Sequence, residues 1–326
     1  MKDETVQSAN ENKSSILIVN FNTGKLLIKC IESIYKFENN DNFEIIIVDQ
    51  ASQDGSPEII KLIAGKYPNI KYILNENNTG FAKGNNSAAK LSDGKYILIL
   101  NPDIVLKEPI IEKFKNILAV KDNGAVSPLL EGVDEKLQFS YYQKYPTVRQ
   151  FIYFHSFFTK YFKNNIKLRK KFLYNEDLLE GREDLVTVSQ IPCAFFFTTR
   201  EIYNEYGGLN EKYFLFFEDV DISFRIGKKY NILVDCENRV MHYGGASFNI
   251  NKNPEIFGNY ILSMNIFFDC NYNILSAIIL KFITLLNSFL IISIEILKSP
   301  LKMHDRFRLK KHIHFLKLFL NHYFKF

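Results

Sequence analysis

Short apolar runs separated by helix-like segments constrain the fold of this chain more than any other feature of its sequence. The runs lack the apolar-polar alternation of a strand with one wet face, so they are typical of strands covered on both sides. Strands that alternate with helices predict right-handed βαβ units, and hence an α/β, Rossmann-like, mostly parallel sheet flanked by helices. The predicted strands are 15–21, 43–49, 70–74 and 96–100, and the predicted helices cover about 25–37, begin near Pro57, cover about 80–90, and begin after Pro109.

The run "YILILNPDIVL" stops abruptly at its polar residues. Pro102 cannot donate a hydrogen bond to a sheet ladder, so we expect the strand over 96–100 to end before it. Asp103 then follows the carboxyl end of that strand. Ligands of open parallel sheets bind beyond the carboxyl ends of the strands, so Asp103 is predicted to lie at a ligand site.

The second half of the chain is less regular. We expect a buried strand over 191–200, a helix that begins in "FFEDVDISFR", and short strands over 231–235 and 239–245. The aromatic and lysine-rich segment over about 135–180 has two interpretations. It is either an insertion that contacts an acceptor or lipid, or an irregular surface segment with a half-buried aromatic face.

Acidic residues follow two of the predicted strands. Asp49 closes "EIIIVD", Asp54 lies in the turn "SQDGSP", and Asp103 follows "YILIL". Taken singly, Asp54 is a good turn former or helix cap, and Asp103 suits a turn. Taken together, they are predicted to lie along one edge of one sheet. Carboxylates there are the ligands of a hard divalent cation, which offsets the charge of a diphosphate.

Two further segments carry residues with possible chemistry. Glu218, Asp219 and Asp221 either favour a helix amino terminus through its dipole, or include a carboxylate whose pKa is raised for general-base work. His242, taken alone, is more typical of a hydrogen-bonded structural histidine than of a metal ligand. Gly80 precedes a helix, but the glycine spacing matches neither the dinucleotide fingerprint nor the P-loop.

The cysteines and the amino-terminal residues indicate a cytosolic protein. The four cysteines are far apart and form no C-x-x-C pair, which argues against a zinc site or a disulfide framework and favours reduced thiols. Residues 1–14 are polar, unlike a signal peptide, and are expected to be disordered.

The carboxyl-terminal segment, 271–326, combines an apolar helix with a basic tail. Eight Lys and Arg and one acid lie from Lys298 onward, so the net charge of +5 resides there. We interpret 274–297 as an amphipathic helix in a membrane interface, because its polar residues fall near one face. A helix packed on the body and a transmembrane helix are the alternatives. Because apolar residues are interleaved with the basic ones, the tail suits lipid better than nucleic acid.

In this order, several motifs resemble the family 2 inverting glycosyltransferases of the GT-A fold, and especially their rhamnosyltransferase-like branch. They span about 15–248 and are "VNFNTGKLLIKCIESI", "IIIVDQASQDGS", "NENNTGFAKGNNSAA", "YILILNPDIVL", "GGLNEKYFLFFEDVDISFRIGKKY" and "VMHYGGAS". The resemblance implies one transferase domain over 15–270, with a nucleotide-sugar half (15–128) and an acceptor half (129–270).

The resemblance also implies a role for each matching residue. Asp49 and Asp54 match acids that hold the base and ribose, and Asp103 matches the last acid of a D-x-D-type motif that binds Mn²⁺ or Mg²⁺ on the diphosphate. Asp219 matches the general base, and His242 matches a histidine that helps hold the metal or diphosphate. The remaining donor-binding residues implied by the resemblance are Gln50, Gly80, Phe81, Asn85, Asn86 and Asn101.

Departures from the family pattern affect the expected donor. Asn101 takes the first position of the D-x-D motif, a form common in the rhamnosyltransferase-like branch, whereas Gln50 and Phe21 replace the usual residues near the base pocket. The resemblance therefore implies transfer of rhamnose from dTDP-rhamnose to a saccharide or lipid-linked acceptor, at the inner face of the cell membrane, in surface polysaccharide biosynthesis. The alternatives are a UDP-hexose-dependent transferase and a catalytically silent carbohydrate- or nucleotide-binding membrane protein.

Overall fold

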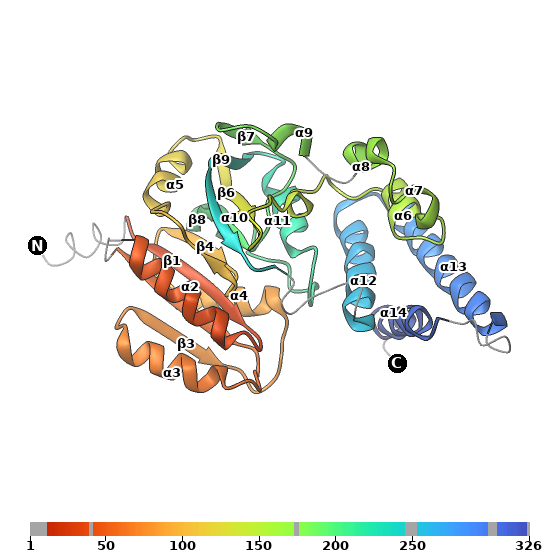
Figure 1. The fold of residues 1–326 in the computed structure, drawn as a ribbon, viewed down its shortest axis with the longest axis horizontal. Helices are drawn as coiled ribbons and strands as arrows, with labels where there is room; N and C mark the ends of the chain where they lie inside the picture. Colours follow the sequence, from red (N-terminus) through yellow and green to blue (C-terminus); the bar gives the residue numbers. More distant parts are fainter. Residues whose placement is uncertain (1–11, 39–41, 173–175, 245–252, 299–304, 325–326) are drawn as a thin grey trace, which may run out of the picture. The chain divides into compact units, whose positions relative to one another are not determined.

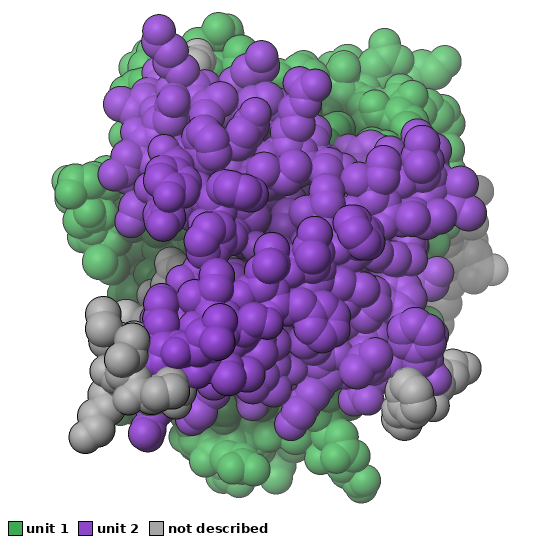
Figure 2. All heavy atoms as spheres, turned by 90° about the vertical axis from the view of Figure 1, so that its right-hand side faces the viewer, with its two compact units in different colours: residues 1–145, 174–211, 218–247 green, residues 146–173, 212–217, 248–326 purple. Residues whose placement is uncertain are grey.

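The computed structural model describes residues 12–38, 42–172, 176–244, 253–298 and 305–324. Its contacts divide the chain into two compact units (Figure 2). Unit 1 contains residues 1–145, 174–211 and 218–247, and unit 2 contains 146–173, 212–217 and 248–326. The amino-terminal segment expected to be disordered, 1–14, lies almost wholly outside the described residues.

Unit 1 is built on a twisted mixed sheet with helices on its faces (Figure 1). Its described strands lie in the order β3-β2-β1-β4-β8-β6-β9-β5, with β7 paired to β9. The strands are β1 Ser14–Asn20, β2 Phe43–Asp49, β3 Ile70–Leu74, β4 Tyr96–Leu100, β5 Ile104–Val105, β6 Asn123–Glu131, β7 Leu185–Thr187, β8 Phe195–Thr199 and β9 Asn231–His242. The α/β, Rossmann-like prediction is confirmed.

The first four strands run parallel, as predicted, and the remaining strands have mixed directions, with β5 and β7 antiparallel to β9. β8 pairs antiparallel with both β4 and β6, and β9 runs parallel to β6. The predicted strand over 191–200 is shorter than expected, because β8 covers only Phe195–Thr199. The two short strands expected over 231–235 and 239–245 form one strand, β9, whose register with β6 shifts between Asp235 and Arg239.

Helices of unit 1 connect the strands. They are α2 Gly24–Phe37, α3 Ser56–Lys66, α4 Phe81–Leu91, α5 Ile111–Leu118, the 3₁₀ turn η1 Phe139–Tyr141, α9 Glu176–Leu179, α10 Arg200–Glu205 and α11 Glu218–Ile226. Pro57 lies in the first turn of α3, where its missing N–H costs nothing. The predicted helices are therefore confirmed as α2, α3, α4, α5 and α11.

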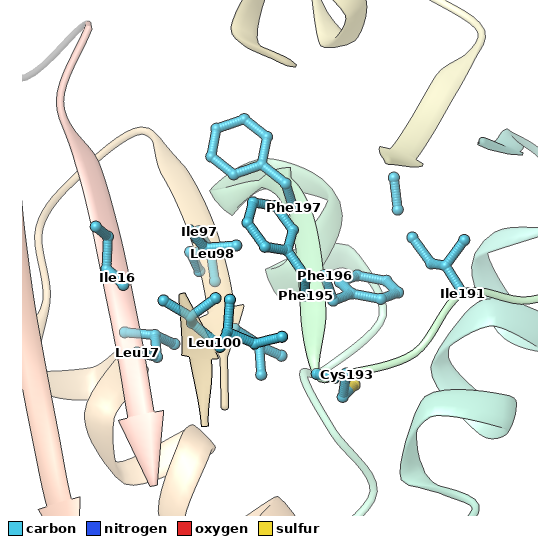
Figure 3. Close-up of a cluster of buried hydrophobic side chains, with 14 of the residues drawn as sticks. Ile16, Leu17, Ile97, Leu98, Leu100, Ile191, Cys193, Phe195, Phe196 and Phe197 are labelled. Atoms are coloured by element: carbon cyan, nitrogen blue, oxygen red, sulfur yellow. The ribbon is translucent and has the colours of Figure 1, made fainter. Parts of the chain in front are cut away.

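The core of unit 1 is concentrated where β1, β4 and β8 meet. Phe195, Phe196 and Phe197 are fully buried beside apolar side chains of β1 and β4 (Figure 3). Phe197 stacks on Tyr96 with ring centroids 5.7 Å apart, and Phe114 of α5 meets Phe195 edge-on at the same distance. This aromatic layer holds the parallel strands to the antiparallel ones.

Unit 2 is helical. Its described helices are α6 Val148–Phe154, α7 Thr159–Phe162, α8 Ile166–Phe172, α12 Pro254–Asn271, α13 Ile274–Lys298 and α14 Arg306–Phe324. The segment 135–180 is thus largely a series of short helices. Among the described residues, α13 alone is long and apolar enough to cross a membrane by length and composition.

The polar face predicted for α13 exists, but it points inward. Thr284, Ser288 and Glu295 are buried, whereas Phe282 and Phe289 are exposed. The sequence analysis placed the polar residues near one face, and hydrogen-bonding groups on α12 and α14 contact that face.

We predict that Phe197→Ala lowers the free energy of unfolding by about 3–5 kcal/mol, because it removes a buried ring from a packed layer. Denaturant unfolding measures the change. Leu62→Ala, at a side chain that is 75% exposed, is the control and should change stability by less than about 0.5 kcal/mol. Equal effects of the two substitutions would contradict the assignment of this layer as the core.

Candidate active site

The topology of unit 1 brings most of the predicted site residues to one edge of the sheet. β1, β2 and β4 are parallel neighbours, so Asp49 and Asp103 follow strand ends on the same side. Two direction reversals through β8 and β6 make β9 parallel to β4, which puts His242 at that edge as well. Asn101 donates its backbone N–H to Ala194 O, directly before β8 begins.

Asp103 and His242 form a pair at this edge. Asp103 Oδ1 lies 3.4 Å from His242 Nε2, and the side chains are 13% and 2% exposed. β5, which begins one residue after Asp103, pairs with the end of β9, with Ile104 opposite His242. The Tyr243 N–H also donates to Asp103 O at 3.0 Å. The strand β4 therefore ends before Pro102. The pairing of β5 with β9 and the hydrogen bond from Tyr243 then hold Asp103 beside His242.

Gln138, a residue that sequence analysis missed, orients the His242 ring. Its Nε2 donates to His242 O at 3.0 Å, which fixes the amide so that Oε1 faces His242 Nδ1 at 2.7 Å. Since Oε1 only accepts, Nδ1 carries a proton, and Nε2 is the ring nitrogen that faces Asp103. No spacing signal links positions 138 and 242, because they meet only through the tertiary fold.

Tyr141 is a second residue that sequence analysis missed. Its ring meets His242 edge-on with centroids 4.8 Å apart. Burial, together with the charges of Asp103 and Asp219, raises the pKa of the phenol to about 12, so it stays protonated at neutral pH. Tyr141 therefore offers a hydroxyl donor near both acids.

Asp49 lies at the predicted edge, but its oxygens are used by the fold. It is almost fully buried, accepts from Asn20 Nδ2 at 2.7 Å and accepts from the Ser52 N–H at 2.9 Å. Ser52 Oγ in turn accepts from the Asn22 N–H. Asp49 thus ties the loop after β2 to the loop after β1, and its contact with a nucleotide stays a prediction.

Asp54 caps two helices. Its Oδ2 accepts from the Gly24 N–H at the start of α2, and its Oδ1 accepts from the Ser56 N–H and hydroxyl at the start of α3. Burial opposes ionisation, but the hydrogen bonds from Ser56 and Gly24 outweigh it and lower the pKa of Asp54. These contacts match the cap interpretation, and a role in holding ribose stays a prediction.

Gln50 fixes the loop that leads into α4. Its Oε1 accepts from the Thr79 N–H at 2.9 Å, and its Nε2 donates to Gly80 O at 3.0 Å. Gly84 makes this approach possible, because a Cβ there would lie 2.4 Å from Gln50 Nε2 and 2.9 Å from Val19. The glycine signal in "TGFAKGNN" therefore has a packing cause, with Gly80 at φ +91° before the helix.

The other predicted residues of α4 face the protein interior to different extents. Phe81 packs partly on the core. Asn85 is buried and donates to Phe81 O, while its own Oδ1 has no partner in the structure. Asn86 donates to Leu209 O and accepts from the Tyr203 hydroxyl, so it joins α4 to the loop before α11. Donor binding by these residues stays a prediction.

The three acids at the start of α11 have different environments. Asp221 is buried and pairs with Arg225 at 2.7 Å, so it serves the fold. Asp219 keeps some solvent access. Burial raises the pKa of Asp219 to about 6, although the amides of Val220, Asp219 and Cys193 oppose the rise. Asp219 is therefore ionised at neutral pH yet basic enough to accept a proton.

Glu218 is buried, and its Oε2 has no hydrogen-bond partner in the structure. Burial and the neighbouring charge of Asp219 raise the pKa of Glu218 to about 8, so at neutral pH this carboxyl is protonated. A neutral Glu218 leaves Asp219 as the ionised member of the pair.

The donor set suits a divalent cation that shares its coordination with a substrate. Among the described residues, no group of three or more His, Cys, Asp or Glu side chains is arranged to hold a metal alone. Asp103 and His242 supply one oxygen and one oriented nitrogen. Mg²⁺ sites often take few protein ligands and complete their coordination with phosphates and water, so the pair fits such an ion.

Glu218 should make stability depend on pH. Its folded pKa lies above its ordinary value of 4.5, so the folded state holds more protons and stability falls as pH rises from about 4.5 to 8. The fall should approach 1.4 kcal/mol per pH unit, the slope for one proton. Denaturant unfolding at pH 5.5 and 8.5 should show a smaller fall in Glu218→Gln. Asp221→Asn, the control, should destabilise at both pH values; an unchanged pH slope in Glu218→Gln would contradict the assignment.

Comparison with known sequences identifies relatives along most of the chain. The model of Glycosyl transferase family 2 matches residues 15–182, just over half of the chain. Glycosyltransferase GlyG of Streptococcus pneumoniae is 34% identical over 112 residues, which are 34% of this chain and 37% of that protein. The chain thus spans little more than a third of that relative. The uncharacterized glycosyltransferase MJ1057 of Methanocaldococcus jannaschii is 25% identical over 292 residues, 85% of this chain and 90% of that protein.

Two further relatives are named for rhamnosyl transfer and for teichoic acid biosynthesis. The N-acetylglucosaminyl-diphospho-decaprenol L-rhamnosyltransferase of Mycobacterium tuberculosis is 23% identical over 201 residues, 56% of this chain and 61% of that protein. The Minor teichoic acid biosynthesis protein GgaB of Bacillus subtilis is 32% identical over 103 residues, 31% of this chain and 11% of that protein.

Solved structures agree on the fold. TarS 1–349 of S. aureus has a TM-score of 0.51 at 15% identity and covers 80% of this chain and 66% of its own. The mannosyltransferase PcManGT of Pyrobaculum calidifontis, solved with GDP-Man and Mn²⁺, has a TM-score of 0.56 at 13% identity and covers 97% and 88%. At such identities the likeness concerns the fold alone. With the family match over residues 15–182, it follows that this chain belongs to glycosyltransferase family 2 and has the GT-A fold.

Proposed function

We propose that the protein is an inverting, metal-dependent glycosyltransferase that moves rhamnose from dTDP-rhamnose to a saccharide or lipid-linked saccharide, in surface polysaccharide biosynthesis. The observation that carries the proposal is the convergence of the Asp103–His242 pair with Tyr141, whose phenol lies in the field of both Asp103 and Asp219. A carboxylate-imidazole pair suits a cation-bound diphosphate, and a nearby carboxylate of raised pKa suits a general base.

The reaction is a single displacement at the anomeric carbon. The acceptor oxygen forms the new bond to that carbon as the bond to the diphosphate oxygen breaks, and the diphosphate leaves with the electron pair. Asp219 Oδ takes the acceptor proton, since its pKa of about 6 leaves it ionised at neutral pH. Attack opposite the leaving group inverts the anomeric configuration.

The surrounding residues hold the reacting groups. Asp103 and His242 would hold Mn²⁺ or Mg²⁺, which when bound supplies positive charge to the leaving diphosphate. Gln138 keeps Nε2 of His242 facing the Asp103 carboxylate. Glu218, protonated and buried, adds no second negative charge beside Asp219.

The donor and the location rest on different supports. The rhamnosyl donor is supported by Asn101 in place of the first acid of the motif, and by the 23% identity to the mycobacterial rhamnosyltransferase. A UDP-hexose donor is the second candidate, and structures of this fold include TarS in complex with UDP. A cytoplasmic site at the inner face of the cell membrane is supported by the exposed apolar face of α13.

A thermal-shift panel of nucleotide sugars with and without Mn²⁺ tests the donor. A ligand present at 100 times its Kd or more should add about 2.7 kcal/mol or more to stability. We expect dTDP-rhamnose with Mn²⁺ to stabilise the wild type and to fail with Asp103→Ala. Glu183→Ala, at an exposed acid of unit 1, is the matched control and should respond as the wild type does. A response to UDP-hexoses instead would replace the donor, and no response to any donor would favour the silent binding protein.

The pH profile of turnover tests the base. The apparent kcat/KM of the wild type should rise with pH through about 6 and then level, because Asp219 must be ionised to accept the proton. Asp219→Asn should lower kcat by about 10²–10⁴-fold while donor-induced thermal shifts persist. A variant that retains wild-type turnover would exclude Asp219 as the base.

A further inference from the structure

Helix α13 has the reverse of the polarity expected for a helix on a water-soluble domain. The side of α13 that packs against the rest of unit 2 carries more polar than apolar buried side chains. The buried residues of α13 are Ala277, Leu280, Thr284, Asn287, Ser288, Ile291 and Glu295. A helix of a soluble protein ordinarily buries its apolar stripe and exposes its polar one.

The buried polar groups of α13 are satisfied within unit 2. Thr284 Oγ1 donates to Lys281 O at 2.9 Å and lies 3.3 Å from Asn265 Oδ1 of α12, and Ser288 Oγ lies 3.0 Å from His312 Nδ1 of α14. Asn287 Oδ1 accepts from the Phe157 N–H at 2.7 Å. These bonds fix the rotation of α13, because turning it outward would leave the partners buried and unpaired.

Glu295 fixes the end of the helix in the same orientation. Its carboxylate accepts from the Asp305 N–H at 2.8 Å, from Arg308 Nη1 at 3.3 Å and from Lys298 Nζ at 3.4 Å. The carboxylate therefore stays charged and is matched by cations of α13 and α14. Polar contacts therefore hold the middle and the carboxyl end of the inward face, whereas its amino-terminal end buries Ala277 and Leu280.

The outward face of α13 is almost entirely apolar. Its exposed large apolar residues are Ile274, Leu275, Ile278, Ile279, Phe282, Leu286, Phe289, Leu290, Ile296 and Leu297. They extend along a helix of 25 residues, which is about 37 Å long at 1.5 Å per residue. An exposed apolar patch of this extent on one element marks an interaction surface.

The charge beside this face is positive. α14 packs on α13 and carries exposed Arg306, Lys310 and Lys317, and the chain from Lys298 onward has eight basic residues and one acid. An apolar helix next to a basic one matches the acyl chains and the anionic headgroups of a bilayer at the same time.

We propose that α13 inserts its outward face into the acyl-chain region of one leaflet of an anionic bilayer and lies along the interface, while α14 contacts the headgroups. This deepens the membrane location proposed above and does not depend on sugar transfer. A crossing orientation would carry the charged residues of α14, bound to α13 through Ser288 and Glu295, into the hydrocarbon. The interfacial orientation leaves them in the headgroup layer.

The chain contains no tryptophan, so one introduced tryptophan reports its own surroundings. In Phe282→Trp, at a side chain 64% exposed, the emission should shift to shorter wavelength with phosphatidylglycerol/phosphatidylcholine vesicles, and lipids brominated along the acyl chain should quench it. Leu62→Trp, at an exposed position of unit 1, is the matched control and should not respond. An unresponsive Phe282→Trp would overturn the proposal, as would quenching that is strongest for bromines at the bilayer centre.

Vesicle sedimentation measures the strength of the same contact. Phe282→Ser with Phe289→Ser should weaken binding at least tenfold, and vesicles of phosphatidylcholine alone should bind the wild type more weakly than anionic ones. Leu62→Ser with Val133→Ser is the control pair and should bind as the wild type does. Undiminished binding of the double serine variant would refute the insertion.

Two further readouts separate this inference from its rivals. Donor-induced thermal shifts of the double serine variant should equal those of the wild type; failure of donor binding in both proteins, with vesicle binding intact, would count against the proposed function alone. Light scattering without lipid should find a monomer. A wild-type dimer that the double serine variant loses, with no vesicle binding, would mean that a second copy covers α13 and would overturn the proposal.

Discussion

The antiparallel pairing of β4 with β8 is the constraint on which the rest of unit 1 depends. It ends the parallel half of the sheet and, with the reversal between β8 and β6, returns β9 to the direction of β4. His242 consequently lies at the same edge as Asp103. The phenylalanines of β8 stabilise this junction, because they pack on Tyr96 of β4 and on Phe114 of α5. A loss of that pairing would separate the two members of the proposed metal-binding pair.

The predicted polar residues of the site form two groups. One group hydrogen-bonds to the neighbouring loops, and the other supplies the proposed reactive side chains and their supports. The loops after β1 and β2 and the loop before α4 are hydrogen-bonded to Asp49, Gln50 and Asp54. Such bonds hold the loops in one conformation, which would lower the entropic cost of ordering the proposed nucleotide sugar against them. Asp103 faces His242, and Asp219 accepts from the Val220 N–H but keeps some solvent access. Gln138 uses both ends of its amide on His242.

Unit 2 follows a different physical rule. Its α13 buries hydrogen-bonding side chains and exposes apolar ones, so water is a poor solvent for its outward face. A transferase with a lipid-linked acceptor needs its catalytic unit near the bilayer where that acceptor resides. In the function and membrane contact proposed above, the inverted helix and its basic neighbour would hold the protein at the bilayer.

The sequence by itself determined the parallel half of the fold and which residues are candidates for the site. Unbroken apolar runs ended by Pro102 or by an acid predict strands and their carboxyl ends, because these patterns are local. The hydrogen-bond partners of the polar side chains were decided only by the tertiary structure. Asp54 caps two helices that begin 32 residues apart, and Gln138 meets His242 across 104 residues. The composition of α13 indicated two faces, but which one points inward depends on partners from α12 and α14, since a buried polar group is tolerated only where the fold supplies its hydrogen bonds.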